Sequence, residues 1–175
     1  MNRITLAIFS LLLLVTTPLY ADEPQNPAYD FMTQGWGGEA IQGYEKTRDV
    51  KGFFHRVGKI TNESVRLIKR KDNPSVNDEF YTFQYDGMTV SVYLARFEHE
   101  DRVMVVDVVI TSPSWQVKQG LGVGTTRKQI EALFGKSMVA GPNSEWTYGD
   151  GPDDVTYTFD KSSKAVSIHW HSVLD

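Results

Sequence analysis

The sequence contains no cysteine among its 175 residues. This absence excludes a disulfide framework, thiol catalysis and cysteine-ligated metal centres. It also removes the cysteine to which a bacterial lipoprotein attaches its lipid, so we expect no lipid anchor. The stability of the fold must therefore come from a hydrophobic core, which a chain of this length can supply.

Neither a basic surplus nor a familiar catalytic motif is present. Lys and Arg number 18 against 22 Asp and Glu, and the formal net charge of −4 argues against nucleic acid as the main partner. The G-x-S-x-G, S-x-x-K and H-E-x-x-H patterns of hydrolases do not occur. We therefore expect a protein that is not an enzyme and that carries no cofactor.

The one long apolar run, at residues 4–15, is too short for a helix that crosses a bilayer. One arginine precedes this run, and Pro18 and Ala21 follow it. This order is typical of a cleavable secretory signal peptide, here residues 1–21. The predicted mature protein is a single domain, residues 22–175, in the periplasm or secreted, with no membrane insertion after signal removal.

Two short helices are predicted, each with an apolar stripe at helical spacing. Thr126 and Gln129 have the spacing of a capping box, and Gly135 suits the C-terminal end of the same helix. The stripe of this helix comprises Ile130, Leu133 and Phe134. The stripe of the earlier helix comprises Val50, Phe53, Phe54 and Val57.

Alternating strands follow each helix. After the first helix we predict strands at 79–85, 88–94 and 103–111, with 64–69 as an optional further strand. After the second helix we predict strands at 145–148, 155–159 and 165–170. A helix followed by a three-strand meander thus occurs twice, which favours an internal duplication with repeat 1 at about 45–111 and repeat 2 at about 120–171.

These elements predict an α+β fold, in which an antiparallel sheet carries both helices on one face. By alternation, the side chains that face the helices include Val155, Tyr157, Phe159, Val166, Ile168 and Trp170. Tyr93, His169 and His171 then lie on the opposite, polar face. The strand at 103–109 is apolar on both faces except at Asp107, which indicates a central strand.

The segment Gly120–Lys136, GLGVGTTRKQIEALFGK, resembles the repeat helix of a superfamily that includes the β-lactamase inhibitor proteins and the SmpA/OmlA-type outer-membrane proteins. Residues 145–150, EWTYGD, and the closing strands to Trp170 continue the similarity, which spans about residues 110–171. The resemblance implies a non-catalytic protein that presents a sheet surface to another protein. In the inhibitors two tandem units lie over an enzyme, and in the outer-membrane group a single unit serves barrel assembly. This chain departs from both groups because it has no cysteine.

His169 and His171 are candidate metal ligands, because two histidines at i and i+2 on a strand share a face. The remaining ligands would have to be carboxylates from neighbouring segments. The alternative is two exposed histidines near the end of the chain; the sequence favours this alternative, so no metal site is predicted. Trp115, in the connector between the repeats, is the best candidate for an exposed interface anchor, although core packing is the commoner role of a single tryptophan.

The leading functional hypothesis is a non-catalytic periplasmic protein-binding module, an inhibitor or immunity-type protein that occludes an envelope-targeted enzyme. The predicted binding residues are Tyr93, Asp107, Trp115, His169 and His171. A second hypothesis is an accessory factor in outer-membrane or envelope assembly. A third is a small metal-binding protein or hydrolase that uses His169 and His171.

Overall fold

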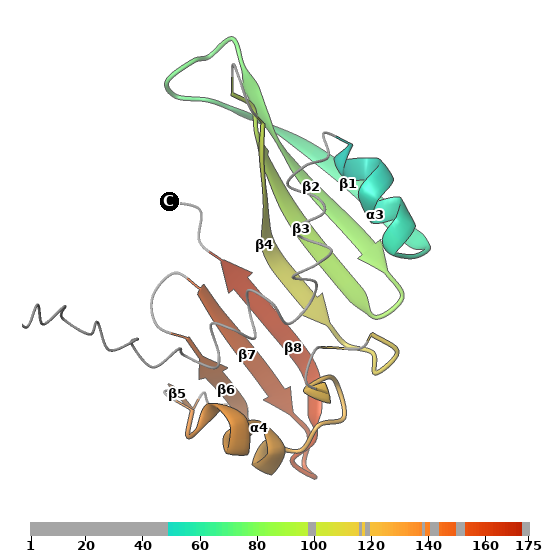
Figure 1. Cartoon of the computed structure of the whole chain (residues 1–175), viewed down its shortest axis with the longest axis vertical. Coiled ribbons are helices and arrows are strands. Elements are labelled where there is room, and N and C mark those ends of the chain that lie inside the picture. Colours follow the sequence, from blue (N-terminus) through green and yellow to red (C-terminus); the bar gives the residue numbers. More distant parts are fainter. Residues whose placement is uncertain are drawn as a thin grey trace, which may run out of the picture.

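The computed structural model describes residues 49–97, 101–115, 117, 120–137, 139–140, 144–149 and 153–172. These residues form two α-helices and one antiparallel sheet (Figure 1). Neither helix has the length and apolar content that crossing a membrane requires. The predicted signal peptide lies outside the described residues.

The helices are α3 (Val50–Val57) and α4 (Arg127–Phe134), and each is followed by a series of strands. After α3 come β1 (Ile60–Lys69), β2 (Asn77–Tyr85), β3 (Met88–Ala95) and β4 (Arg102–Ile110). After α4 come β5 (Val139–Ala140), β6 (Glu145–Tyr148), β7 (Asp153–Phe159) and β8 (Ala165–Ser172). The predicted α+β class with an antiparallel sheet is confirmed, while β5 is absent from the sequence-based prediction.

The strand order across the sheet is β1-β2-β3-β4-β8-β7-β6-β5. The strands that follow α3 therefore meet those that follow α4 where β4 pairs with β8 (Figure 1). In this antiparallel pairing Asp107 lies opposite His171, and Ile110 lies opposite Ile168. Residues from distant parts of the sequence are thus brought onto adjacent central strands.

Helix α4 begins and ends where the sequence predicts. The Thr126 hydroxyl accepts the Gln129 N–H at 3.3 Å, and the Gln129 side-chain oxygen accepts the Thr126 N–H at 3.0 Å, which completes the capping box. Gly135 ends the helix with φ 78°, in the left-handed region that favours glycine. Ile130 is fully buried, but Leu133 is 39% exposed, so the buried stripe is narrower than predicted.

Helix α3 begins at a different kind of cap. The Asp49 carboxylate accepts the Gly52 N–H at 2.8 Å. Val50 and Phe54 are buried, and the Phe54 ring stacks on Phe83 of β2 with the ring centroids 4.6 Å apart. These contacts confirm the predicted inner face of the helix and hold it over β2.

Both helices pack on the same face of the sheet, as predicted. One hydrophobic cluster contains Phe54 of α3, Ile130 of α4 and the inward side chains of the strands between them. From β3 and β7 these inward residues are Val90, Val92, Leu94, Val155, Tyr157 and Phe159. The predicted inner face of β7 is therefore confirmed, and the inward residues of β3 alternate with Tyr93, which is predicted to face away from the helices.

One predicted side-chain direction, that of Val166, is wrong. Thr158 pairs with Ser167 and Phe159 pairs with Ala165, so β8 contains one extra residue at Val166. Such a β-bulge interrupts the alternation of faces along a strand. Val166 is consequently 42% exposed, and Ala165 takes its place in the core.

Candidate functional site

The face of the sheet opposite the helices carries most of the residues that the sequence singles out. Both helices pack on the other side, so no helix within the described ranges covers this surface, which we call the open face. Asp107 of β4, His171 of β8 and Asp154 of β7 lie side by side in one row across it. His169 lies in the next row, opposite Val109 of β4.

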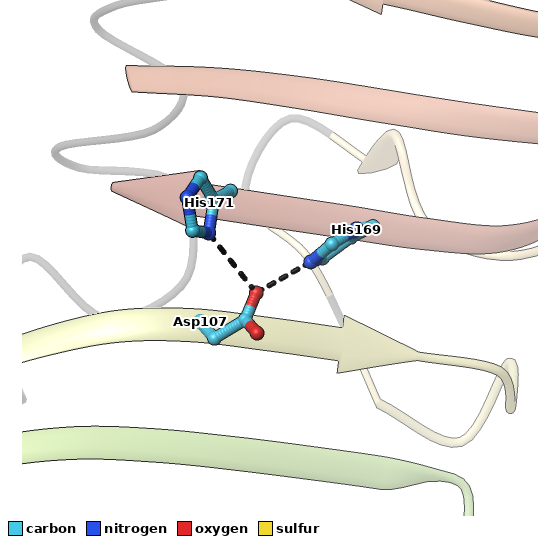
Figure 2. Close-up of side chains that lie close together, drawn as sticks. All are labelled: Asp107, His169 and His171. Carbon is cyan, nitrogen blue, oxygen red and sulfur yellow. Dashed lines mark hydrogen bonds and ion pairs between the residues drawn. The ribbon is translucent and has the colours of Figure 1, made fainter. Parts of the chain in front are cut away.

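Asp107, His169 and His171 converge where β4 meets β8 (Figure 2), and we call them the histidine cluster. The Nε2–H of His169 donates a hydrogen bond to Oδ1 of Asp107, and Nδ1 of His171 lies 3.6 Å from the same oxygen. The side chains of the three residues are 36%, 46% and 45% exposed, respectively. One carboxylate oxygen thus faces two imidazoles that solvent and other molecules can reach.

A second β-bulge, in β4, is what turns Asp107 toward the histidines. Val92 pairs with Val105 and Ser91 pairs with Asp107, which leaves Val106 as an extra residue. With regular alternation from Val105, Asp107 would face the apolar core, where an unpaired carboxylate is strongly unfavourable. The bulge reverses the direction and places the carboxylate on the open face.

Tyr93 also lies on the open face, but it belongs to a neighbouring group of residues. Its hydroxyl donates a hydrogen bond to Asp78, a buried carboxylate that also accepts the Arg96 N–H at 2.8 Å. The hydrogen bond to Asp78, together with burial, raises the pKa of Tyr93 to about 12. Tyr93 pairs with Met104 rather than with Asp107, so it stands apart from the histidine cluster.

A hollow of about 490 Å³ opens beside Tyr93, on the part of the open face that strands β1 to β4 form. We call it the basic groove, because Lys69, Arg70, Lys71 and Arg102 are among its lining residues, together with Phe97. The guanidinium carbons of Arg70 and Arg102 lie 4.7 and 5.4 Å from the centre of the Phe97 ring. Asp72, which is ion-paired with Arg70, and Asp78 also line the hollow, but they offset only part of the four basic charges. The groove therefore presents a net positive charge around an aromatic ring that is itself 43% exposed.

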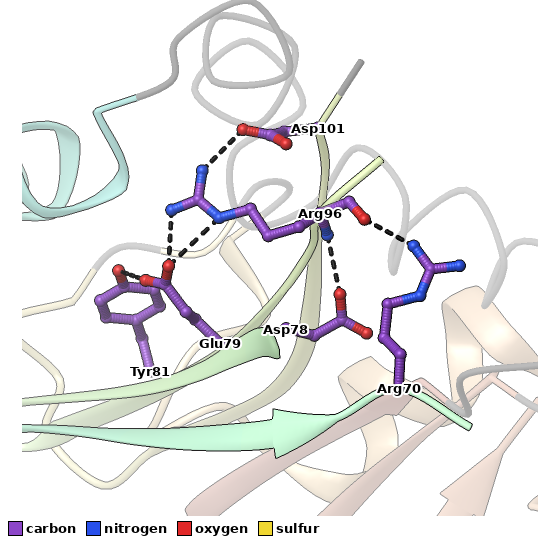
Figure 3. A network of polar contacts seen from close by, with 6 residues as sticks. All are labelled: Arg70, Asp78, Glu79, Tyr81, Arg96 and Asp101. Carbon is purple, nitrogen blue, oxygen red and sulfur yellow. Dashed lines mark hydrogen bonds and ion pairs between the residues drawn. The ribbon is translucent and has the colours of Figure 1, made fainter. Parts of the chain in front are cut away.

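A network of polar contacts includes two of the residues that line the basic groove, Arg70 and Asp78 (Figure 3). Arg96 donates hydrogen bonds to Glu79 and to Asp101, each at 2.6 Å, and its backbone carbonyl accepts one from Arg70 at 2.5 Å. Burial raises the pKa of Glu79, but hydrogen bonds from Tyr81 and Arg96 outweigh that effect and hold the pKa below its ordinary value. The ionised Glu79 anchors the Arg96 side chain. Arg70 is oriented by the Asp72 carboxylate, which accepts two of its hydrogen bonds, and by the Arg96 backbone carbonyl.

The structure separates Trp115 from the other predicted binding residues. Its ring packs edge-on against Tyr85 with centroids 5.3 Å apart, and its indole N–H donates a hydrogen bond to the Asp86 carbonyl at 2.7 Å. Tyr85 belongs to the core beneath the helices, not to the open face. Trp115 is thus partly buried and packs next to the turn between β2 and β3, which agrees with the commoner core-packing role of a tryptophan. Its role as a binding residue stays a prediction.

The sequence analysis does not place Asp154 beside His171, nor does it bring Arg102 to the basic residues 69–71. Asp154 shares its face with Thr156 and Thr158, so strand alternation could have placed it beside His171. The meeting of Arg70 with Arg102 carries no comparable local signal, because it depends on the pairing of β1 through β4.

Comparison with known proteins yields no family model, no curated protein and no solved structure that matches this chain.

Proposed function

We propose that this chain is a non-catalytic periplasmic protein-binding module that occludes an envelope-targeted enzyme. The observation that supports the proposal best is the open face, a sheet surface whose polar, charged and aromatic side chains no described helix covers. Arginine and aromatic residues are enriched at protein interfaces, and both occur here. The predicted signal peptide supports the assignment to the periplasm.

The charge of the basic groove favours a partner that presents acidic side chains. Arg70 and Arg102 lie against the exposed ring of Phe97, and Lys71 lines the same hollow. Guanidinium groups form strong hydrogen bonds to carboxylates, and arginines and aromatic rings supply much of the energy of protein interfaces. In this proposal an acidic segment of the enzyme enters the basic groove, while the rest of the open face covers its active site.

The order of the elements supports a further part of the proposal, that the chain contains two tandem helix–sheet units. One unit comprises α3 with β1–β4, and the other comprises α4 with β5–β8. The units are joined side by side through β4 and β8. A sheet built from two such units offers a wider binding surface than one unit alone, which suits a partner of the size of an enzyme.

The proposal can be tested by affinity capture from an envelope extract, with the purified protein and two charge-reversal variants as baits. The Arg102→Glu variant changes the basic groove. The Lys128→Glu variant changes an exposed residue on α4, on the other side of the sheet, and serves as the matched control. We expect the parent and Lys128→Glu proteins to retain the same partner, and the Arg102→Glu protein to lose it.

The retained protein should be an enzyme, and addition of the purified chain should inhibit it at a stoichiometry of about one to one. Binding should weaken as salt is added, since ionic contacts at a surface are screened. Equal capture by all three baits would show that the open face is not the interface. Capture of an enzyme that keeps its full activity in the complex would contradict occlusion.

A further inference from the structure

The histidine cluster has the donor set of a transition-metal site. Imidazole nitrogens and a carboxylate oxygen are the ligands that Zn²⁺ takes in sites with three protein ligands and one open position. Nε2 of His169, Nδ1 of His171 and Oδ1 of Asp107 supply such a set, and ligand atoms of the three residues lie within 4.8 Å of one another. All three residues project from two hydrogen-bonded strands, which is a rigid scaffold for a site.

The distances require only small side-chain rotations. Zinc–nitrogen and zinc–oxygen bonds of about 2.0–2.2 Å in a tetrahedral site place neighbouring ligand atoms about 3.4 Å apart. Nδ1 of His171 lies 3.6 Å from Oδ1 of Asp107, close to this spacing. Nε2 of His169 contacts the same oxygen directly, so a metal ion would replace that hydrogen bond by one bond to each partner.

A third histidine, His55, shows what an ordinary surface ion pair looks like in this protein. His55 of α3 contacts Glu63 at 3.0 Å, and Lys51 contacts the other carboxylate oxygen of Glu63 at 3.2 Å. A lysine beside the carboxylate satisfies its charge and repels a metal ion. The histidine cluster differs, because both partners of Asp107 there are imidazoles. In addition, a further aspartate, Asp154 of β7, lies opposite His171 of β8 in the strand register.

We propose that Asp107, His169 and His171 bind one divalent transition-metal ion of the zinc class, with a coordination position left open on the exposed side. The open position would be filled by water or by a donor group of another molecule. This site does not depend on the protein-binding function proposed above. Asp154 lies beside His171 and adds negative charge that favours a cation.

The test is a zinc titration of the metal-free parent protein, measured by calorimetry and by competition with a chromophoric chelator. We expect one equivalent to bind. The His171→Ala and Asp107→Asn variants should each weaken the affinity at least about tenfold, because even the removal of groups that only support metal ligands has effects of this size. The His55→Ala variant is the matched control, and its affinity should equal that of the parent.

A measurement on the parent protein identifies the ligands without any substitution. In nitrogen-15 spectra of the imidazole side chains, zinc should shift Nε2 of His169 and Nδ1 of His171 and leave His55 unchanged. Absence of stoichiometric binding to the parent would overturn the proposal. So would a loss of affinity in His55→Ala as large as that in His171→Ala, or zinc-induced shifts confined to other histidines.

Discussion

On the helix-covered face of the sheet, Phe83, Val90 and Tyr157 are fully buried, whereas on the open face the side chains of Asp107, His169 and His171 are between 36% and 46% exposed. The two faces are built from the same strands, so neighbours in the sequence have opposite roles. Fully buried apolar side chains supply most of the stability of a small domain. Half-exposed titratable side chains supply little stability and are available for binding. Substitutions on the two faces should therefore have separable effects.

The largest effect on stability is expected for Phe54→Ala, which removes the ring that joins α3 to the sheet. Phe54 is 1% exposed and stacks on Phe83, so its truncation leaves a cavity in the core. We expect the free energy of unfolding to fall by about 3–5 kcal/mol, measured by urea unfolding. Leu67→Ala on β1 is the control, because Leu67 is 61% exposed and its truncation creates no cavity. Equal stability of the Phe54→Ala protein and its parent would disprove the packing of α3.

A second comparison uses two residues of β8 that regular alternation would place on the same face. Ile168 is 3% exposed, whereas Val166 is 42% exposed because of the bulge. Ile168→Ala should lower the free energy of unfolding by about 2–5 kcal/mol. Val166→Ala should change it by less than about 0.5 kcal/mol. Similar losses for both variants in urea unfolding would mean that β8 has no bulge at Val166.

The stability of the fold should fall at alkaline pH, because tyrosines on the helix-covered face then ionise. Burial raises the pKa of Tyr148 to about 12, and burial with the Glu79 hydrogen bond raises that of Tyr81 to about 12. A phenol whose pKa is higher in the folded than in the unfolded protein contributes stability below pH 10, and this contribution is lost as the pH rises toward 12. Urea unfolding at pH 8, 10 and 11 should show this decline.

The Tyr148→Phe variant tests whether Tyr148 contributes to the predicted loss of stability at alkaline pH. The Tyr148 hydroxyl is buried and has no hydrogen-bond partner among the described residues, so its removal should not lower stability at pH 8. The variant should lose less stability than the parent between pH 10 and 11, since it has one phenol fewer to ionise. An identical decline in the two proteins would show that Tyr148 is not responsible.

Much of the fold could be predicted because its signals are local. The capping box of Thr126 and Gln129 and the alternation along β3 both depend on residues close in sequence, and the structure contains both. The two bulges could not be predicted in this way. The extra residues Val106 and Val166 are defined by the register of partner strands, which no local pattern records.

The candidate site shows the same limit. The shared face of His169 and His171 follows from their spacing, and Asp107 is the only charged residue within the otherwise apolar run at 103–109. Their convergence, however, requires both the β4–β8 pairing and the bulge at Val106. The contact of Trp115 with Tyr85 could not be predicted either, because it belongs to the connector and follows no strand periodicity.

A small effect on stability is expected for the double variant His169→Ala/His171→Ala. Both imidazoles are nearly half exposed, and their contacts with Asp107 lie at the surface, where such pairs contribute little. The free energy of unfolding without metal should therefore stay within about 0.5 kcal/mol of that of the parent. Zinc should then separate the two proteins, because an ion that binds only the folded state raises the midpoint of unfolding of the parent and leaves that of the variant unchanged. A large loss of stability without metal would mean that the histidines hold β4 and β8 together. It would then be wrong that the helix-covered face alone stabilises the fold while the open face serves binding.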